Sequence, residues 1–189
     1  MSAILDLPEA RARVMRWSVK EYERFTEMGA FRKSVELIRG IVVEKISKSP
    51  LHVTLSQKLL DLFKALVPSG FCVRHEAPLK ARDSVPEPDL AVVKGTVADY
   101  SEIHPSTATL VVEVAVSNVV LDRENASLYA EAGVDEYWFV LPNQRQVEVY
   151  REPRDGAYAV KFNCEAPAVL ECASMPQIRV NLEEMFKVA

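Results

Sequence analysis

Apolar residues recur at two spacings along this chain, and each spacing predicts a type of secondary structure. One set lies on a single face of a helix over about residues 51–67, with intervals of four, three and four: Leu55, Leu59, Leu62 and Leu66. An earlier helix begins after Ser18, because Glu21 follows three residues later and completes a capping box. That helix ends by Gly29, and a further helix is predicted over about 122–132.

Short β-branched segments predict the strands of one sheet. In chain order they cover about residues 34–38, 41–46, 71–79, 89–93, 109–116, 136–141 and 146–150. The tail adds a strand pair at about 157–163 and 177–180, and a short helix near 182–187. Helices therefore alternate with hairpins and strands, which predicts an α/β (α+β) fold with a central mixed β-sheet flanked by helices.

Two carboxylates interrupt these apolar strands. Asp89 stands at the start of the strand within Val85–Val93, and Glu113 has three apolar residues on each side within Thr109–Val116. A lone ionised carboxylate in such a strand costs several kcal/mol, which a divalent metal would compensate. Two other roles stay open: Asp89 as a turn or cap residue, and Glu113 as a buried acid held by an arginine or a backbone amide.

Composition indicates a globular protein and excludes several classes. The 189 residues are 49% hydrophobic and 26% charged, which suits one domain over 17–189 after an arm over 1–16. No apolar run reaches the ~20 residues of a membrane span, and the N-terminus lacks a secretory signal. Three cysteines without metal-ligand spacing predict free thiols in the cytoplasm and argue against zinc. The net charge of −4 argues against tight, non-specific DNA binding.

The two acids predict Mg²⁺ chemistry. Mg²⁺ takes oxygen ligands and usually binds through one or two carboxylates, waters and a substrate phosphate. Asp89, Glu113 and the carbonyl of residue 114 or 115 are the expected donors, and Mn²⁺ is expected to substitute. A third acid, Glu36, either joins this site from the first hairpin or faces solvent.

The chain also resembles a widespread bacterial family of restriction-endonuclease-type proteins, formerly a domain of unknown function, within the PD-(D/E)xK nuclease superfamily. The likeness runs from Trp17 to Tyr150, and its landmarks are Val35–Gly40, Ser49–His52, Glu87–Asp89, Val112–Val114, Asp122–Arg123 and Tyr129–Trp138. The resemblance implies a restriction endonuclease-like core, DNA as partner, and metal ligation by Asp89 and Glu113. It also implies Glu36 as an accessory acid. Many nucleases of this fold pair to cut both strands, so it allows a homodimer.

The pattern breaks at the lysine that this superfamily uses beside its acids. Ala115 occupies the motif position, and the family's alternative position on the following helix holds Asn125, or Ala126 in a second alignment. Asn125 shares the inward stripe of that helix with Leu128 and Ala132, but it is neutral and is not a base.

Other residues near the motifs have candidate roles. Arg123 is expected to clamp a phosphate, and Lys80 or Lys94 to approach the acids from other elements. His52 is expected to cap the second helix, contact phosphate or lie beside the acids. The sequence thus predicts a metal-dependent DNA endonuclease with a degenerate site. The alternative is a weak or inactive nuclease fold that binds nucleic acid or serves in an assembly.

Overall fold

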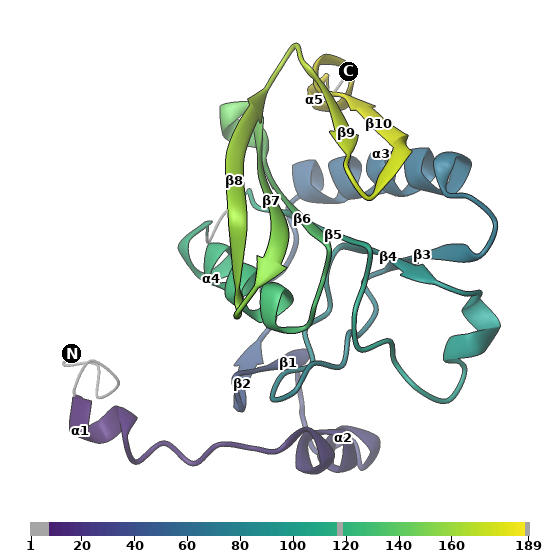
Figure 1. Ribbon diagram of the computed structural model, residues 1–189. Helices are drawn as coiled ribbons and strands as arrows, with labels where there is room; N and C mark the ends of the chain where they lie inside the picture. Colours follow the sequence, from purple (N-terminus) through teal and green to yellow (C-terminus); the bar gives the residue numbers. More distant parts are fainter. Residues whose placement is uncertain (1–7, 117–118, 188–189) are drawn as a thin grey trace. The chain divides into compact units, whose positions relative to one another are not determined.

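The computed structural model describes residues 8–116 and 119–187 (Figure 1). Its helices are α1 (Pro8–Arg11), α2 (Val19–Glu27), α3 (Pro50–Leu66), α4 (Val119–Glu131) and α5 (Leu182–Phe186), with 3-10 turns η2 (Val97–Tyr100) and η3 (Pro142–Gln144). Its strands are β1 (Val35–Ile38), β2 (Ile41–Glu44), β3 (Phe71–His75), β4 (Leu90–Lys94), β5 (Leu110–Val114), β6 (Glu136–Leu141), β7 (Gln146–Arg154), β8 (Ala157–Glu165), β9 (Val169–Cys172) and β10 (Met175–Asn181). The predicted mixed α/β fold is confirmed.

The chain forms two compact units, and the first comprises the chain up to Lys45 together with Asp83–Val85. Helix α2 begins at Ser18, whose side chain forms the predicted capping box with Glu21. Strands β1 and β2 form the predicted hairpin, and a small core of this unit contains Tyr22, Leu37 and Val85. The expected division into an arm over 1–16 and one domain over 17–189 stays a prediction.

The second unit comprises Ile46–Arg82 and Pro86–Ala189 and holds a six-stranded sheet in the order β3-β4-β5-β6-β7-β8. All neighbours in this sheet are antiparallel except β5 and β6, which are parallel. A crossover through α4 joins the parallel pair, as a parallel connection requires. The sheet is therefore mixed.

Helices cover the two faces of this sheet. On one face, Leu55, Leu59 and Phe63 of α3 pack against alternate strand residues. Trp138 belongs to this face, with its ring centroid 6.0 Å from that of Phe63. Successive strand residues point to opposite faces, so Tyr137 lies on the other face, where its ring is 5.1 Å from that of Tyr129 on α4.

The predicted pairing of the tail is wrong. Strand β8 pairs antiparallel with β7, and β10 pairs with a short strand, β9, that the periodicity did not reveal. The reason for the first pairing is local: Asp155 and Gly156 both have positive φ, at 52° and 78°, and Asp-Gly is a preferred two-residue hairpin turn. The tail therefore forms two local hairpins.

A fully buried carboxylate attaches the β9–β10 hairpin to the sheet. Glu136 has 0% exposure and accepts hydrogen bonds from Trp138 Nε1 at 2.6 Å and from the backbone N–H of Ala173 at 2.7 Å. The guanidinium of Arg151 lies 2.9 Å from the same carboxylate. Three donors therefore compensate this charge. The neighbouring Cys172 has a free thiol, as do the other two cysteines.

Across the described ranges, no helix is long and apolar enough to span a membrane.

Candidate active site

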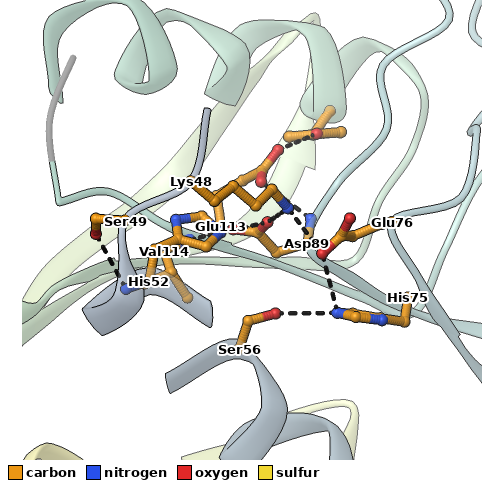
Figure 2. A network of polar contacts seen from close by, with 10 residues as sticks. Lys48, Ser49, His52, Ser56, His75, Glu76, Asp89, Glu113 and Val114 are labelled. Carbon is orange, nitrogen blue, oxygen red and sulfur yellow. Dashed lines mark hydrogen bonds and ion pairs between the residues drawn. The ribbon is translucent and has the colours of Figure 1, made fainter. Parts of the chain in front are cut away.

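Asp89 and Glu113 meet because their strands are antiparallel neighbours. Pro86 and Pro88 keep the chain extended before β4, and Asp89 immediately precedes that strand. The backbone N–H of Asp89 donates to Glu113 Oε2 at 3.1 Å, and the backbone N–H of Val114 donates to Asp89 Oδ2 at 2.8 Å. The Glu113 carboxylate thus binds the backbone of Asp89, and the Asp89 carboxylate binds the backbone of the residue that follows Glu113. The predicted adjacency of these two residues is confirmed (Figure 2).

Helix α4 orients Glu113 from the opposite side. Val112 and Val114 face the core around α3, so Glu113 between them points toward the α4 face. There the hydroxyl of Tyr129 donates to Glu113 Oε1 at 2.7 Å. Glu113 is half-buried rather than enclosed on both faces, and its two oxygens are held by a backbone amide and a phenol.

Two cationic or proton-bearing groups converge on the other oxygen of Asp89. Lys48 Nζ lies 2.6 Å from Asp89 Oδ1, and His52 Nε2 lies 2.9 Å from the same atom. His52 is in the first turn of α3, which Ser49 caps by accepting from the backbone N–H of His52. An ionised carboxylate only accepts hydrogen bonds, so His52 carries its proton on Nε2.

The charges of this cluster stabilise one another. Burial opposes ionisation of Asp89, but the hydrogen bond from His52 and the charge of Lys48 outweigh it and hold the pKa of Asp89 below its ordinary value. Burial alone would lower the pKa of Lys48, yet the charges and hydrogen bonds of Asp89 and Glu76 raise that pKa above its ordinary value. The site therefore contains an ionised carboxylate and a protonated ammonium near neutral pH.

A second set of contacts joins Lys48 to the end of β3. Glu76 Oε1 lies 3.0 Å from Lys48 Nζ and 3.3 Å from His75 Nε2, which also lies 3.2 Å from the hydroxyl of Ser56. Glu76 has a φ of 47°, a left-handed conformation that costs a non-glycine residue about 1 kcal/mol or more. Figure 2 shows these side chains as one polar network around Lys48 and Asp89.

The other residues singled out in the sequence lie elsewhere or stay untested. Glu36 is in β1 of the first unit, paired with Val43, and its accessory role stays a prediction. Lys80 is exposed in the loop after β3. Lys94 ends β4, about 16 Å along the strand from Asp89, at ~3.3 Å per residue.

Two further candidates belong to α4. Asn125 is half-buried, one turn before Tyr129 and on the same side of the helix. The side chain of Arg123 lies outside the described residues.

Sequence reasoning missed five polar members of this network: Lys48, Glu76, Ser56, His75 and the hydroxyl of Tyr129. One signal for Lys48 was available, because it directly precedes the cap Ser49 and lies four residues before His52. Glu76 carried no signal, since a single acid after a strand is ordinary. The 41 residues that separate Lys48 from Asp89 explain why spacing alone did not connect them.

Comparison with known proteins decides the family. The family model for Uma2, described as "Putative restriction endonuclease", matches residues 19–183. The chain belongs to the Uma2 family. No curated protein matches the chain significantly.

A solved structure supports the fold of this Uma2-family chain. The chain is similar to the crystal structure of a protein from Anabaena variabilis ATCC 29413, which is described as a putative nuclease belonging to DUF820. The TM-score is 0.73 at 16% sequence identity, covering 86% of this chain and 96% of that one. This likeness covers both helices and sheet, and it shows the fold alone.

The donor chemistry of the Uma2-family site fits Mg²⁺. Asp89, Glu113 and the carbonyl of Val114 are hard oxygen donors, and Mg²⁺ is usually held by only one or two carboxylates. Among the side chains that the structure describes, no three His, Cys, Asp or Glu residues are grouped so that they could hold a metal ion.

Proposed function

We propose that this chain is a Mg²⁺-dependent endonuclease that hydrolyses phosphodiester bonds of DNA. The observation that carries the proposal is the reciprocal locking of Asp89 and Glu113, each bonded to the backbone at or beside the other. Two preorganised carboxylates next to an ammonium suit phosphoryl chemistry, in which positioning and electrostatic stabilisation provide most of the catalysis. Membership of the Uma2 family supports the same reaction class.

In this proposal Asp89, Glu113 and the carbonyl of Val114 hold Mg²⁺, and Mn²⁺ can replace it. When bound, the ion supplies Lewis acidity, which neutralises charge on the phosphate and makes water a better nucleophile. Lys48 and His52 keep Asp89 ionised and oriented, and Tyr129 orients Glu113. Removal of a hydrogen bond that orients a metal ligand, here the one from Tyr129 to Glu113, typically lowers metal affinity or activity by 10–100-fold.

The reaction is a hydrolysis. The oxygen of water attacks phosphorus, one P–O ester bond breaks, and the leaving oxygen takes up a proton. The products are a phosphate monoester end and a free hydroxyl end. In this proposal Glu36 assists as an accessory acid, and Asn125, Arg123 and Lys80 contact water or phosphate oxygens. A homodimer that cuts both strands is part of the same proposal.

Plasmid nicking tests the proposal. Purified protein is incubated with supercoiled plasmid and Mg²⁺ or Mn²⁺, and its melting temperature is measured with and without Mn²⁺. Wild type is expected to nick slowly and to melt higher with Mn²⁺, because the ion binds only the folded state. Glu113→Gln is expected to lose both properties. Glu183→Gln, an exposed acid paired with Arg145, is the matched control and is expected to keep both. Equal nicking by wild type and Glu113→Gln would refute the proposal.

One observation favours a second candidate, a catalytically weak or inactive module that binds nucleic acid or serves in an assembly. Lys48 already neutralises Asp89 at 2.6 Å, so the buried charge is compensated without a metal. This candidate predicts no Mn²⁺ upshift and no nicking, with binding of a fluorescently labelled DNA duplex retained.

A further inference from the structure

We propose that Lys48 is a catalytic residue that contacts the scissile phosphate, and that Glu76 is the positioning residue that holds it there. This inference rests on the proposed function, because it assigns the cation of that same site. Hydrolysis places an anionic phosphate beside the carboxylates of Asp89 and Glu113, and an ammonium there offsets their repulsion.

The contacts of Lys48 place its charge where this phosphate must approach. Its Nζ lies 2.6 Å from Asp89 Oδ1 and 3.0 Å from Glu76 Oε1, and its side chain is 23% exposed. An ammonium has three N–H donors, and among the residues that the structure describes these two carboxylates accept two of them. The third donor is therefore available to a phosphate oxygen. The remaining exposure gives a substrate access to it.

Neither of the positions at which the nuclease motif or the family resemblance predicts a lysine holds a positively charged residue. Ala115 follows Glu113 by two residues and is buried, and Asn125 on α4 is neutral. Lys94 lies at the far end of β4. Lys48 reaches Asp89 from a different element, the segment that leads into α3.

Glu76 gives Lys48 a fixed position. Its backbone N–H donates to the carbonyl of Asp89 at 3.1 Å, so β3 and the start of β4 are joined at this point. Its left-handed φ of 47° is a strained conformation of the kind found at functional sites. A lysine side chain has four rotatable bonds, and two carboxylate anchors restrict it to one location.

The first test measures phosphate contact without cleavage. Affinity for a labelled DNA duplex is measured at several salt concentrations, with Ca²⁺ replacing Mg²⁺, for wild type and Lys48→Ala. Each phosphate contact contributes about 0.9 to the slope of log K against log salt, so Lys48→Ala is expected to lower that slope by about 0.9. Lys58→Ala is the matched control, because Lys58 on α3 donates to the backbone carbonyls of Glu184 and Lys187. An unchanged slope in Lys48→Ala would overturn the proposal, whether or not wild type cleaves DNA.

The second test measures cleavage. Lys48→Ala is expected to lower the rate of plasmid nicking by about 10²–10³-fold, as for other preorganised electrostatic groups. It is expected to keep the Mn²⁺ upshift, because both carboxylates remain and the loss of the ammonium removes a positive charge that competes with the ion for Asp89. Adding Asn125→Lys to Lys48→Ala is expected to raise the nicking rate at least tenfold, since residue 125 lies one helical turn from Tyr129, which contacts Glu113. Loss of the Mn²⁺ upshift together with activity would assign Lys48 a structural role and overturn the proposal. Failure of wild type to bind Mn²⁺ or nick DNA would instead refute the proposed function, and the salt slope would still decide the phosphate contact.

The third test separates positioning from general stability. Glu76→Gln is expected to slow nicking in the wild-type background and to have no further effect in Lys48→Ala. A residue that acts only through a second residue loses its effect when that residue is removed. Additive losses in the double variant would show that Glu76 acts independently of Lys48.

Discussion

The substitution Tyr129→Phe removes one hydroxyl and tests how much its hydrogen bond to Glu113 contributes to stability and metal binding. Tyr129 is fully buried, and its hydroxyl donates to Glu113 Oε1 at 2.7 Å. Phenylalanine keeps the ring and its packing against Tyr137, so the variant removes this hydrogen bond with little change in volume. The change therefore isolates the support of one proposed metal ligand.

The magnitude follows from the charge of the acceptor. A hydrogen bond to a charged group contributes about 1.5–3 kcal/mol, so we expect the metal-free protein to lose about 2 kcal/mol. For a chain of this size that loss lowers the melting temperature by about 4–8 °C. Loss of a ligand's supporting partner weakens metal binding by about 10–100-fold, which reduces the stabilisation by saturating Mn²⁺ by about 1.4–2.8 kcal/mol.

The assay is a thermal melt monitored by circular dichroism, with and without MnCl₂. Tyr158→Phe is the matched control, because its hydroxyl donates to the backbone carbonyl of Val134 at 2.9 Å, away from the acids. We expect the control to lose about 1 kcal/mol of stability and to keep the full Mn²⁺ upshift. If Tyr129→Phe keeps the wild-type upshift, the hydroxyl does not support a metal ligand and the reasoning fails.

Two further predictions concern the buried groups below the β9–β10 hairpin. Glu136→Ala leaves the guanidinium of Arg151 without its buried acceptor and should cost about 3 kcal/mol in urea unfolding; a loss below about 1 kcal/mol would contradict this. Burial, together with the charge of Glu136, raises the pKa of Cys172 to about 12 from an ordinary value of 9.0. The thiol therefore loses its proton at a lower pH in the unfolded chain than in the folded protein. The free energy of unfolding consequently falls as the pH rises from about 9 to 12. At pH 10.5 this loss is about 2 kcal/mol relative to pH 8, and Cys172→Ala should lack it when both proteins are unfolded in urea at the two pH values. Equal losses in the two proteins would be the contrary result.

The local pattern of the sequence determined most of the secondary structure and the meeting of the two acids. Ser18 and Glu21 specify the start of α2 because a capping box needs only residues three positions apart. Asp89 and Glu113 are adjacent because Asp89 directly precedes the apolar strand β4 and Glu113 lies in β5, and consecutive strands of one sheet are commonly neighbours. These features depend on short-range spacing, which a sequence displays directly.

Only the tertiary structure decided which groups surround those acids. Lys48 reaches Asp89 across 41 residues, and Tyr129 reaches Glu113 across 16, through side chains whose direction depends on packing. Glu76, which contacts Lys48, follows β3 with a left-handed backbone conformation. A glutamate in the sequence gives no sign of that conformation, because non-glycine residues adopt it rarely. A periodicity identifies the buried face of an element, but a long flexible side chain has many rotamers, and the folded surroundings select one of them. The sequence therefore predicted the carboxylates, and the fold supplied their cation.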